Sequence, residues 1–235
     1  MGPSITVRVG SGPSAREFSV HKDLITHYSP FFKAALSDSR WKEGMSNMID
    51  LPEDEPQLFK FYLCWLYGTW PFEYITTCIK FDRKTLECAE FIQLADAYVF
   101  GNKILDFDFC DMVLDSLCAH AHHAHATDLV PTGSFFEIWK VSKKHSAPRK
   151  LLLDAYVYSG SKEWFGASDS DEFDQEAWRC IAEVLIADRE DDTELGADEE
   201  PRKSDDTCRY HLHINETGAC YKKTREWGSL KKALG

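Results

Sequence analysis

The sequence predicts an α+β protein in which a few short strands near the N-terminus are followed by a mostly helical chain. Apolar and polar residues alternate over 5–9, the period of a half-buried strand, and residues 17–20 return as its hairpin partner after a Gly/Pro turn. From residue 22 onward apolar residues instead recur every three or four positions, which is the period of amphipathic helices.

The same reading gives the order of the elements beyond the hairpin. Ser29-Pro30 separates two short helices, because Ser is a favourable N-cap and Pro a favourable first helical residue. A short strand is expected over 48–51. The helix that begins near Pro56 is expected to end at Gly68, since glycine readily adopts the left-handed conformation that terminates helices. Further helices are expected over 86–99, 103–121, 135–145, 151–158 and 173–187.

The helix expected over 103–121 combines apolar and acidic residues. Its period gives Phe107, Cys110, Leu114 and Leu117 a buried face, and turns Asp108, Asp111 and Asp115 outward. Charged residues opposite an apolar stripe normally face water, so these three carboxylates are expected to be exposed.

Composition and charge exclude several classes of function. The formal net charge of the 235 residues is −12, which argues against a general binder of nucleic acid or of anionic membranes. No apolar run approaches the length of a membrane span, and the N-terminus lacks the pattern of a secretory signal. The eight cysteines have no framework spacing, which fits a reducing compartment. We therefore expect an intracellular protein, located in the cytoplasm, the nucleus or both.

Residues 18–68 contain three motifs in a recognisable order. They are Val20-His21-Lys22 before the first helix, Ser29-Pro30-Phe31-Phe32 at the start of the second, and Leu51-Pro52-Glu53-Asp54 after the strand. With these motifs the chain resembles BTB/POZ domains, in particular the small BTB proteins of filamentous fungi. The resemblance implies a small β-sheet flanked by a helical cluster, with a C-terminal helical extension and a short Cys/His tail.

Four regions are expected along the chain. Residues 1–121 form the BTB/POZ domain, and residues 122–187 form the helical extension. Residues 188–206 carry ten acids and three bases with almost no apolar residue, a composition typical of a disordered linker. Residues 207–235 carry six bases and two acids, and form a basic tail that contains cysteine and histidine.

The resemblance implies a non-catalytic module for protein–protein interaction, and the sequence contains no motif of a catalytic or nucleotide-binding site. Cullin-binding BTB proteins carry a hydrophobic-x-Glu element after the second helix, where this chain has Trp41-Lys42-Glu43. An apolar anchor beside a carboxylate suits a partner groove rimmed by a base. Trp41 and Glu43 are therefore the expected partner-binding residues of an adaptor that recruits substrates to a cullin-type ubiquitin ligase. The alternative is that Trp41 packs into its own domain. The resemblance also allows a homodimer, although the four residues before the first expected strand are too few for the strand exchange of longer BTB proteins.

The sharpest chemical pattern is Cys208, His211, His213 and Cys220. Two thiolates and two imidazoles within 13 residues can close a tetrahedral zinc site. In an extended segment both histidines would point to the same side. The alternative is a short strand whose apolar side chains pack while its cysteines and histidines face outward.

Two further expectations depend on this pattern. A zinc-stabilised tail leaves open a nuclear or transcriptional regulator, although the acidic residues before it would repel nucleic acid. Because the linker separates the tail from the rest of the chain, loss of zinc is expected to loosen residues 207–221 and to leave the main unfolding transition unchanged.

Overall fold

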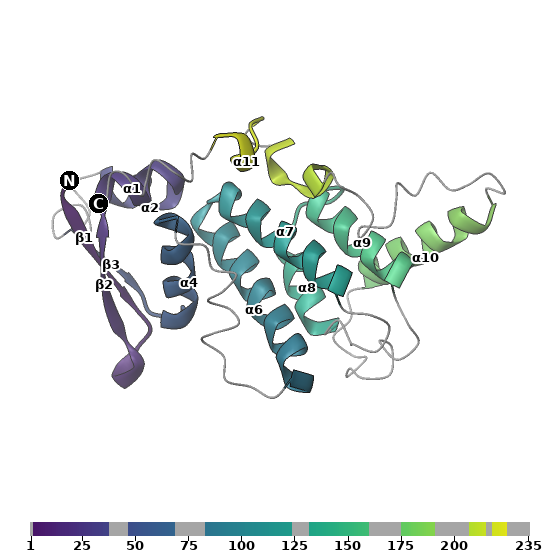
Figure 1. Cartoon of the computed structure of the whole chain (residues 1–235), viewed down its shortest axis with the longest axis horizontal. Coiled ribbons are helices and arrows are strands. Elements are labelled where there is room, and N and C mark those ends of the chain that lie inside the picture. Colours follow the sequence, from purple (N-terminus) through teal and green to yellow (C-terminus); the bar gives the residue numbers. More distant parts are fainter. Residues whose placement is uncertain are drawn as a thin grey trace. The chain divides into compact units, whose positions relative to one another are not determined.

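The fold is α+β and mostly helical, as expected. Figure 1 shows the computed structural model of the chain, which describes residues 2–37, 47–68, 83–123, 132–159, 175–190, 207–214 and 218–224. Within these ranges it contains one three-stranded mixed sheet and nine α-helices. The strands are β1 (Ser4–Val9), β2 (Arg16–His21) and β3 (Met48–Leu51). The helices are α1 (Lys22–Tyr28), α2 (Pro30–Ser37), α4 (Pro56–Leu66), α6 (Arg83–Ile104), α7 (Phe107–His123), α8 (Thr132–Val141), α9 (Ala147–Ser159), α10 (Gln175–Glu190) and α11 (Tyr221–Thr224). The short 3-10 turns are η1 (Gly12–Ser14), η4 (Thr207–Tyr210) and η5 (Leu212–Ile214).

The chain divides into two compact units. The first comprises Met1–Lys80, Phe100–Phe109 and Lys222–Gly235, and the second comprises Phe81–Val99 and Cys110–Tyr221. No helix in the described ranges is both long enough and apolar enough to cross a membrane.

The sheet of the first unit confirms the strand predictions. β1 is central, paired antiparallel with β2 and parallel with β3. Ile5, Val7 and Val9 are buried while the intervening residues are not, as a period of two requires. The two short helices α1 and α2 meet at Ser29-Pro30, and the hydroxyl of Ser29 accepts a bond from the backbone N–H of Phe32, which caps α2.

The junction between α6 and α7 differs from the prediction. A helix start at residue 103 was expected, but α6 continues to Ile104 and the chain turns at Leu105, where φ is +60°. Asp106 then caps α7, because its Oδ1 accepts the backbone N–H of Phe109 at 2.9 Å. Its other oxygen accepts the hydroxyl of Tyr62 at 3.0 Å, within the aromatic core of the first unit.

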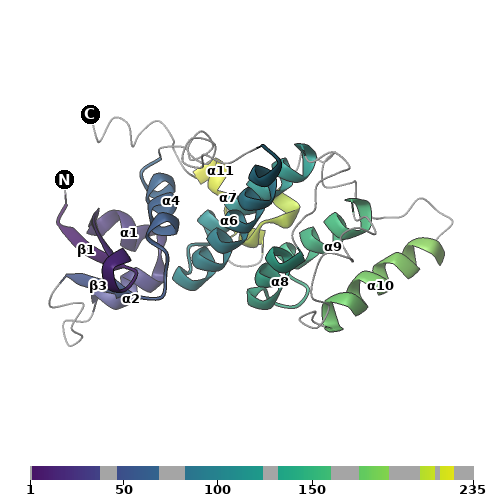
Figure 2. The ribbon, with the colours of Figure 1, turned by 90° about the horizontal axis from the view of Figure 1, so that it is seen from below.

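Helices α8, α9 and α10 pack in series within the second unit. Arg149 of α9 joins them, because its guanidinium lies 4.3 Å from the ring centroid of Trp139 and forms an ion pair with Glu176 of α10 at 3.4 Å. The starts of α8 and α9 lie three and four residues before the expected positions. Pro148, in the first turn of α9, favours the earlier start of that helix. Figure 2, which shows the same ribbon turned by 90°, gives a second view of these helices.

The double role of Asp106 gives a testable prediction. Asp106→Ala removes the cap of α7 and leaves the buried hydroxyl of Tyr62 without this acceptor, so the free energy of unfolding should fall by about 2 to 4 kcal/mol. Tyr62→Phe, which keeps the cap, should cost about 1 kcal/mol. Urea denaturation of the two variants measures both losses. Equal losses would show that the cap contributes nothing.

Candidate metal centre

The four predicted ligands lie on a short, tightly turned stretch that we call the Cys/His segment, residues 207–214 and 218–221. The segment forms two 3-10 turns, η4 and η5, and is neither the extended segment considered for the zinc site nor the short strand of the alternative. The N–H of His211 donates to the carbonyl of Cys208 at 3.0 Å, which holds these two residues in one turn. Gly218, at φ +73°, donates to the carbonyl of His213 at 2.6 Å, and this turn brings Cys220 back toward the histidines.

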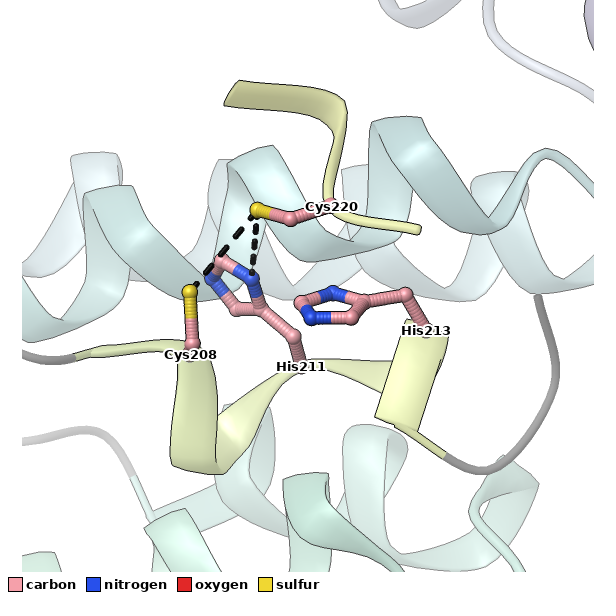
Figure 3. Close-up of side chains that lie close together, drawn as sticks. All are labelled: Cys208, His211, His213 and Cys220. Carbon is pink, nitrogen blue, oxygen red and sulfur yellow. Dashed lines mark hydrogen bonds between the residues drawn. The ribbon is translucent and has the colours of Figure 1, made fainter. Parts of the chain in front are cut away.

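The four side chains converge as a metal site requires. One ligand atom from each residue can be chosen so that all four lie within 4.8 Å of one another. Figure 3 shows the Sγ atom of Cys220 beside that of Cys208, at 3.7 Å, and beside Nδ1 of His211, at 3.8 Å. A tetrahedral zinc ion with ordinary bond lengths separates two thiolate sulfurs by about 3.8 Å and a sulfur from a nitrogen by about 3.6 Å. The cluster could therefore hold a metal such as zinc.

The sulfur atoms are too far apart for a covalent bond. A disulfide has an S–S distance of about 2.05 Å, whereas these two cysteines are free thiols. His211, His213 and Cys220 are buried, and Cys208 is half-buried. The alternative of outward-facing cysteines and histidines is therefore wrong, because they are packed together with the apolar side chains of the same turns.

Two aspartates of α7 hold the histidine rings. Nε2 of His211 lies 2.9 Å from Oδ1 of Asp115, and Nδ1 of His213 lies 2.9 Å from Oδ2 of Asp111. The aspartates are four residues apart and so lie on one face of the helix. Metal-binding histidines usually donate their second ring N–H to such a carboxylate, which fixes the orientation of the ring.

The predicted exposure of Asp111 and Asp115 is therefore wrong. The side chain of Asp111 is fully buried and that of Asp115 is 15% exposed. The helical period correctly placed them away from the apolar stripe, but the Cys/His segment covers this part of α7. That segment lies about a hundred residues later in the chain, so the helical period of α7 does not show which element covers this face.

The same carboxylates bind the backbone and hydroxyl groups of the segment. Asp111 accepts the backbone N–H groups of Leu212 and His213. Asp115 accepts the hydroxyls of Thr207 and Tyr221, the first and last residues of the segment. A third aspartate, Asp154 of α9, accepts the buried hydroxyl of Tyr210 at 2.9 Å. The segment is thus bonded to α7 and to α9.

The carboxylates differ in their electrostatics. Burial raises the pKa of Asp111 above its ordinary value, although His211 and the N–H groups of Leu212 and His213 oppose this shift. Burial also acts to raise the pKa of Asp115. The hydrogen bonds from His211, Thr207 and Tyr221, with the electrostatic attraction of His211, outweigh burial and lower the pKa to about 2. Burial and the neighbouring carboxylate raise the pKa of Tyr221, so its hydroxyl stays a hydrogen-bond donor.

Sequence reasoning found the four candidate ligands and missed the three aspartates that hold their segment. One signal was present in the sequence, because Asp111 stands within residues 109–114, whose other members are all apolar. An acid in such a run needs a buried donor from elsewhere in the fold. Trp41 and Glu43, the predicted partner-binding residues, lie outside the described residues.

The comparisons with known proteins supply no family for this chain. No protein-family model matches it, and no curated protein matches it.

The contacts of the segment revise the expected effect of metal removal. Because the Cys/His segment is bonded to α7 and α9, a bound metal should stabilise the second unit as a whole. Zinc added to metal-free protein at about 100 times its Kd should raise the free energy of unfolding by about 2.7 kcal/mol. Magnesium, which prefers oxygen ligands, should have no effect. Thermal unfolding measures both additions, and identical midpoints with and without zinc would contradict the prediction.

Proposed function

We propose that this chain is a non-catalytic protein-interaction module of the BTB/POZ type, whose C-terminal segment is held in place by a structural zinc ion. The observation that carries the zinc assignment is the convergence of two thiols and two imidazoles within 4.8 Å. Thiolates with imidazoles select zinc over magnesium or calcium, which prefer oxygen ligands.

The donor set and its surroundings favour a structural role for the ion. Four protein ligands fill a tetrahedral site, whereas catalytic zinc sites keep one position open for water or substrate. Three of the four ligand residues are buried, and the rings of both histidines are hydrogen-bonded to carboxylates. The ion therefore has no free position from which to act on a substrate, and its effect is to cross-link the Cys/His segment.

The positions of the three sequence motifs support the BTB/POZ assignment. Val20-His21-Lys22 spans the junction of β2 and α1, Ser29-Pro30 separates α1 from α2, and Leu51-Pro52 ends β3. The side chains of these motifs have structural contacts. His21 Nδ1 lies 2.9 Å from the hydroxyl of Tyr67, and the hydroxyl of Ser29 donates to the carbonyl of Ile104 at 2.6 Å. Such contacts give His21 a role in folding and leave no reason to assign it a catalytic one.

Within this proposal the partner is a cullin, and Trp41 and Glu43 form the element that contacts it. A nuclear regulator whose tail touches nucleic acid is less favoured, because the imidazoles and the Cys220 thiol are directed into the second unit. The Cys/His segment is thus packed against its own unit and is not exposed for nucleic acid. The basic residues elsewhere in the tail follow a strongly acidic stretch of sequence, which would repel phosphate.

Elemental analysis tests the zinc assignment. Protein purified without a His-tag should contain about one equivalent of zinc, because four protein ligands form a closed site. The variant Cys208→Ser/Cys220→Ser should lose it. Cys64→Ser/Cys180→Ser, which changes two cysteines outside the cluster, is the matched control and should keep it. Less than about a tenth of an equivalent in the unchanged protein, or equal zinc in all three proteins, would refute the assignment.

Affinity purification tests the partner. Trp41→Ala/Glu43→Ala should abolish co-purification of a cullin from an extract of the native host, because truncating a buried aromatic anchor typically removes about 2 kcal/mol or more of binding energy. Lys42→Ala, between the two positions, should retain the cullin. The melting temperature of the double variant should stay close to that of the unchanged protein. Unfolding of the double variant would instead identify Trp41 as a core residue and overturn the interface.

A further inference from the structure

We propose that Asp111 and Asp115 decide which ring nitrogen of each histidine binds the metal, so that His211 coordinates through Nδ1 and His213 through Nε2. This inference rests on the proposed zinc site. It assigns to the two aspartates of α7 the role of positioning residues, which act on the metal through the imidazole rings and do not touch it.

The assignment for His211 follows from the bonds at both sides of its ring. Nε2 faces Asp115 at 2.9 Å, so this nitrogen carries the proton and donates it to the carboxylate. Nδ1 is then the nitrogen with a free lone pair. It lies 3.8 Å from Sγ of Cys220, close to the spacing of two ligands around one zinc ion (Figure 3).

His213 has the opposite arrangement. Its Nδ1 lies 2.9 Å from Oδ2 of Asp111 and donates to it, which leaves the lone pair of Nε2 for the metal. The two imidazoles meet nearly edge to face, with centroids 5.0 Å apart and an interplanar angle of 72°. One ring therefore offers its Nδ1 and the other its Nε2, because the two carboxylates engage opposite nitrogens.

The carboxylates are held in place independently of a metal. Asp111 also accepts two backbone N–H groups of η5, and Asp115 also accepts two hydroxyls. An asparagine at either position replaces one acceptor oxygen by an NH₂ donor, which would face the donors that the carboxylate now accepts. Asp→Asn at these sites should therefore disturb the ring orientation without a change in side-chain size.

The coordinating atoms can be read directly in the unchanged protein. Cadmium-113 replaces zinc in thiolate-containing sites, and its coupling reaches ring protons three bonds away. A cadmium ion on Nε2 couples to both Hε1 and Hδ2, whereas one on Nδ1 couples to Hε1 alone. We expect His213 to show both couplings and His211 to show only the coupling to Hε1. A cadmium coupling to Hδ2 in both histidines would overturn the inference.

Three variants test the carboxylates as positioning residues. Asp111→Asn and Asp115→Asn should each lower the zinc affinity by about 10- to 100-fold, measured by competition with a chromophoric chelator. In Asp115→Asn the cadmium coupling of His211 should extend to Hδ2 while that of His213 stays unchanged. Asp108→Asn, the same substitution one turn earlier on α7, should leave affinity and couplings unchanged.

The outcomes separate this inference from the proposed zinc site. Absence of stoichiometric zinc in the unchanged protein would refute the zinc site itself. If zinc is stoichiometric but both histidines coordinate through Nε2, the zinc site stands and the role of the aspartates is refuted. The same conclusion follows if zinc affinity and cadmium couplings are unchanged in both Asp111→Asn and Asp115→Asn. If either variant fails to fold, the couplings of the unchanged protein still decide the matter.

Discussion

The second unit depends on the bonds between two carboxylates of α7 and the Cys/His segment. A fully buried carboxylate is costly unless donors surround it. The described donors of Asp111 all come from the segment, namely the backbone of η5 and the ring of His213. Asp115 joins the two ends of the segment through Thr207 and Tyr221. The segment supplies the donors that make burial of these acids tolerable, and the acids fix the segment to the helix.

The small number of contacts that hold the Cys/His segment explains why a metal ion would stabilise it. The segment is short, and its buried apolar side chains are Tyr210, Leu212, Cys220 and Tyr221. Hydrophobic burial of so few side chains gives it a limited driving force. Hydrogen bonds such as that from Tyr210 to Asp154 contribute about 1 kcal/mol each, because on folding they only replace hydrogen bonds to water. A closed zinc site stabilises the segment far more, since the free energy of metal binding is available only when the four ligands are assembled. The carboxylates reduce the cost of that assembly by orienting the rings in advance.

The sequence predicted the local elements well, because their determinants are local. Ile5, Val7 and Val9 specify a strand by alternation, and Ser29-Pro30 divides two helices by capping. The break between α6 and α7 was misplaced because the cap lies at Asp106, beyond a non-glycine residue at positive φ. The ligands were found from their donor types and spacing. The 3-10 turns of the segment and the aspartates that hold it could not be predicted in this way, since both depend on the contact of the segment with α7.

The burial of the proposed zinc site also constrains how it would serve the proposed interaction module. Because His211 and His213 are directed into the second unit, the ligands themselves cannot supply a contact surface for a partner. Any partner must instead bind residues outside the cluster, such as the Trp41–Glu43 element of the proposed cullin interface. A bound metal would act on the Cys/His segment itself, whose ends Thr207 and Tyr221 are hydrogen-bonded to α7. A change in metal occupancy would alter the order of the segment and the stability of its unit, and it would leave the chemistry of an interface formed by other residues unchanged.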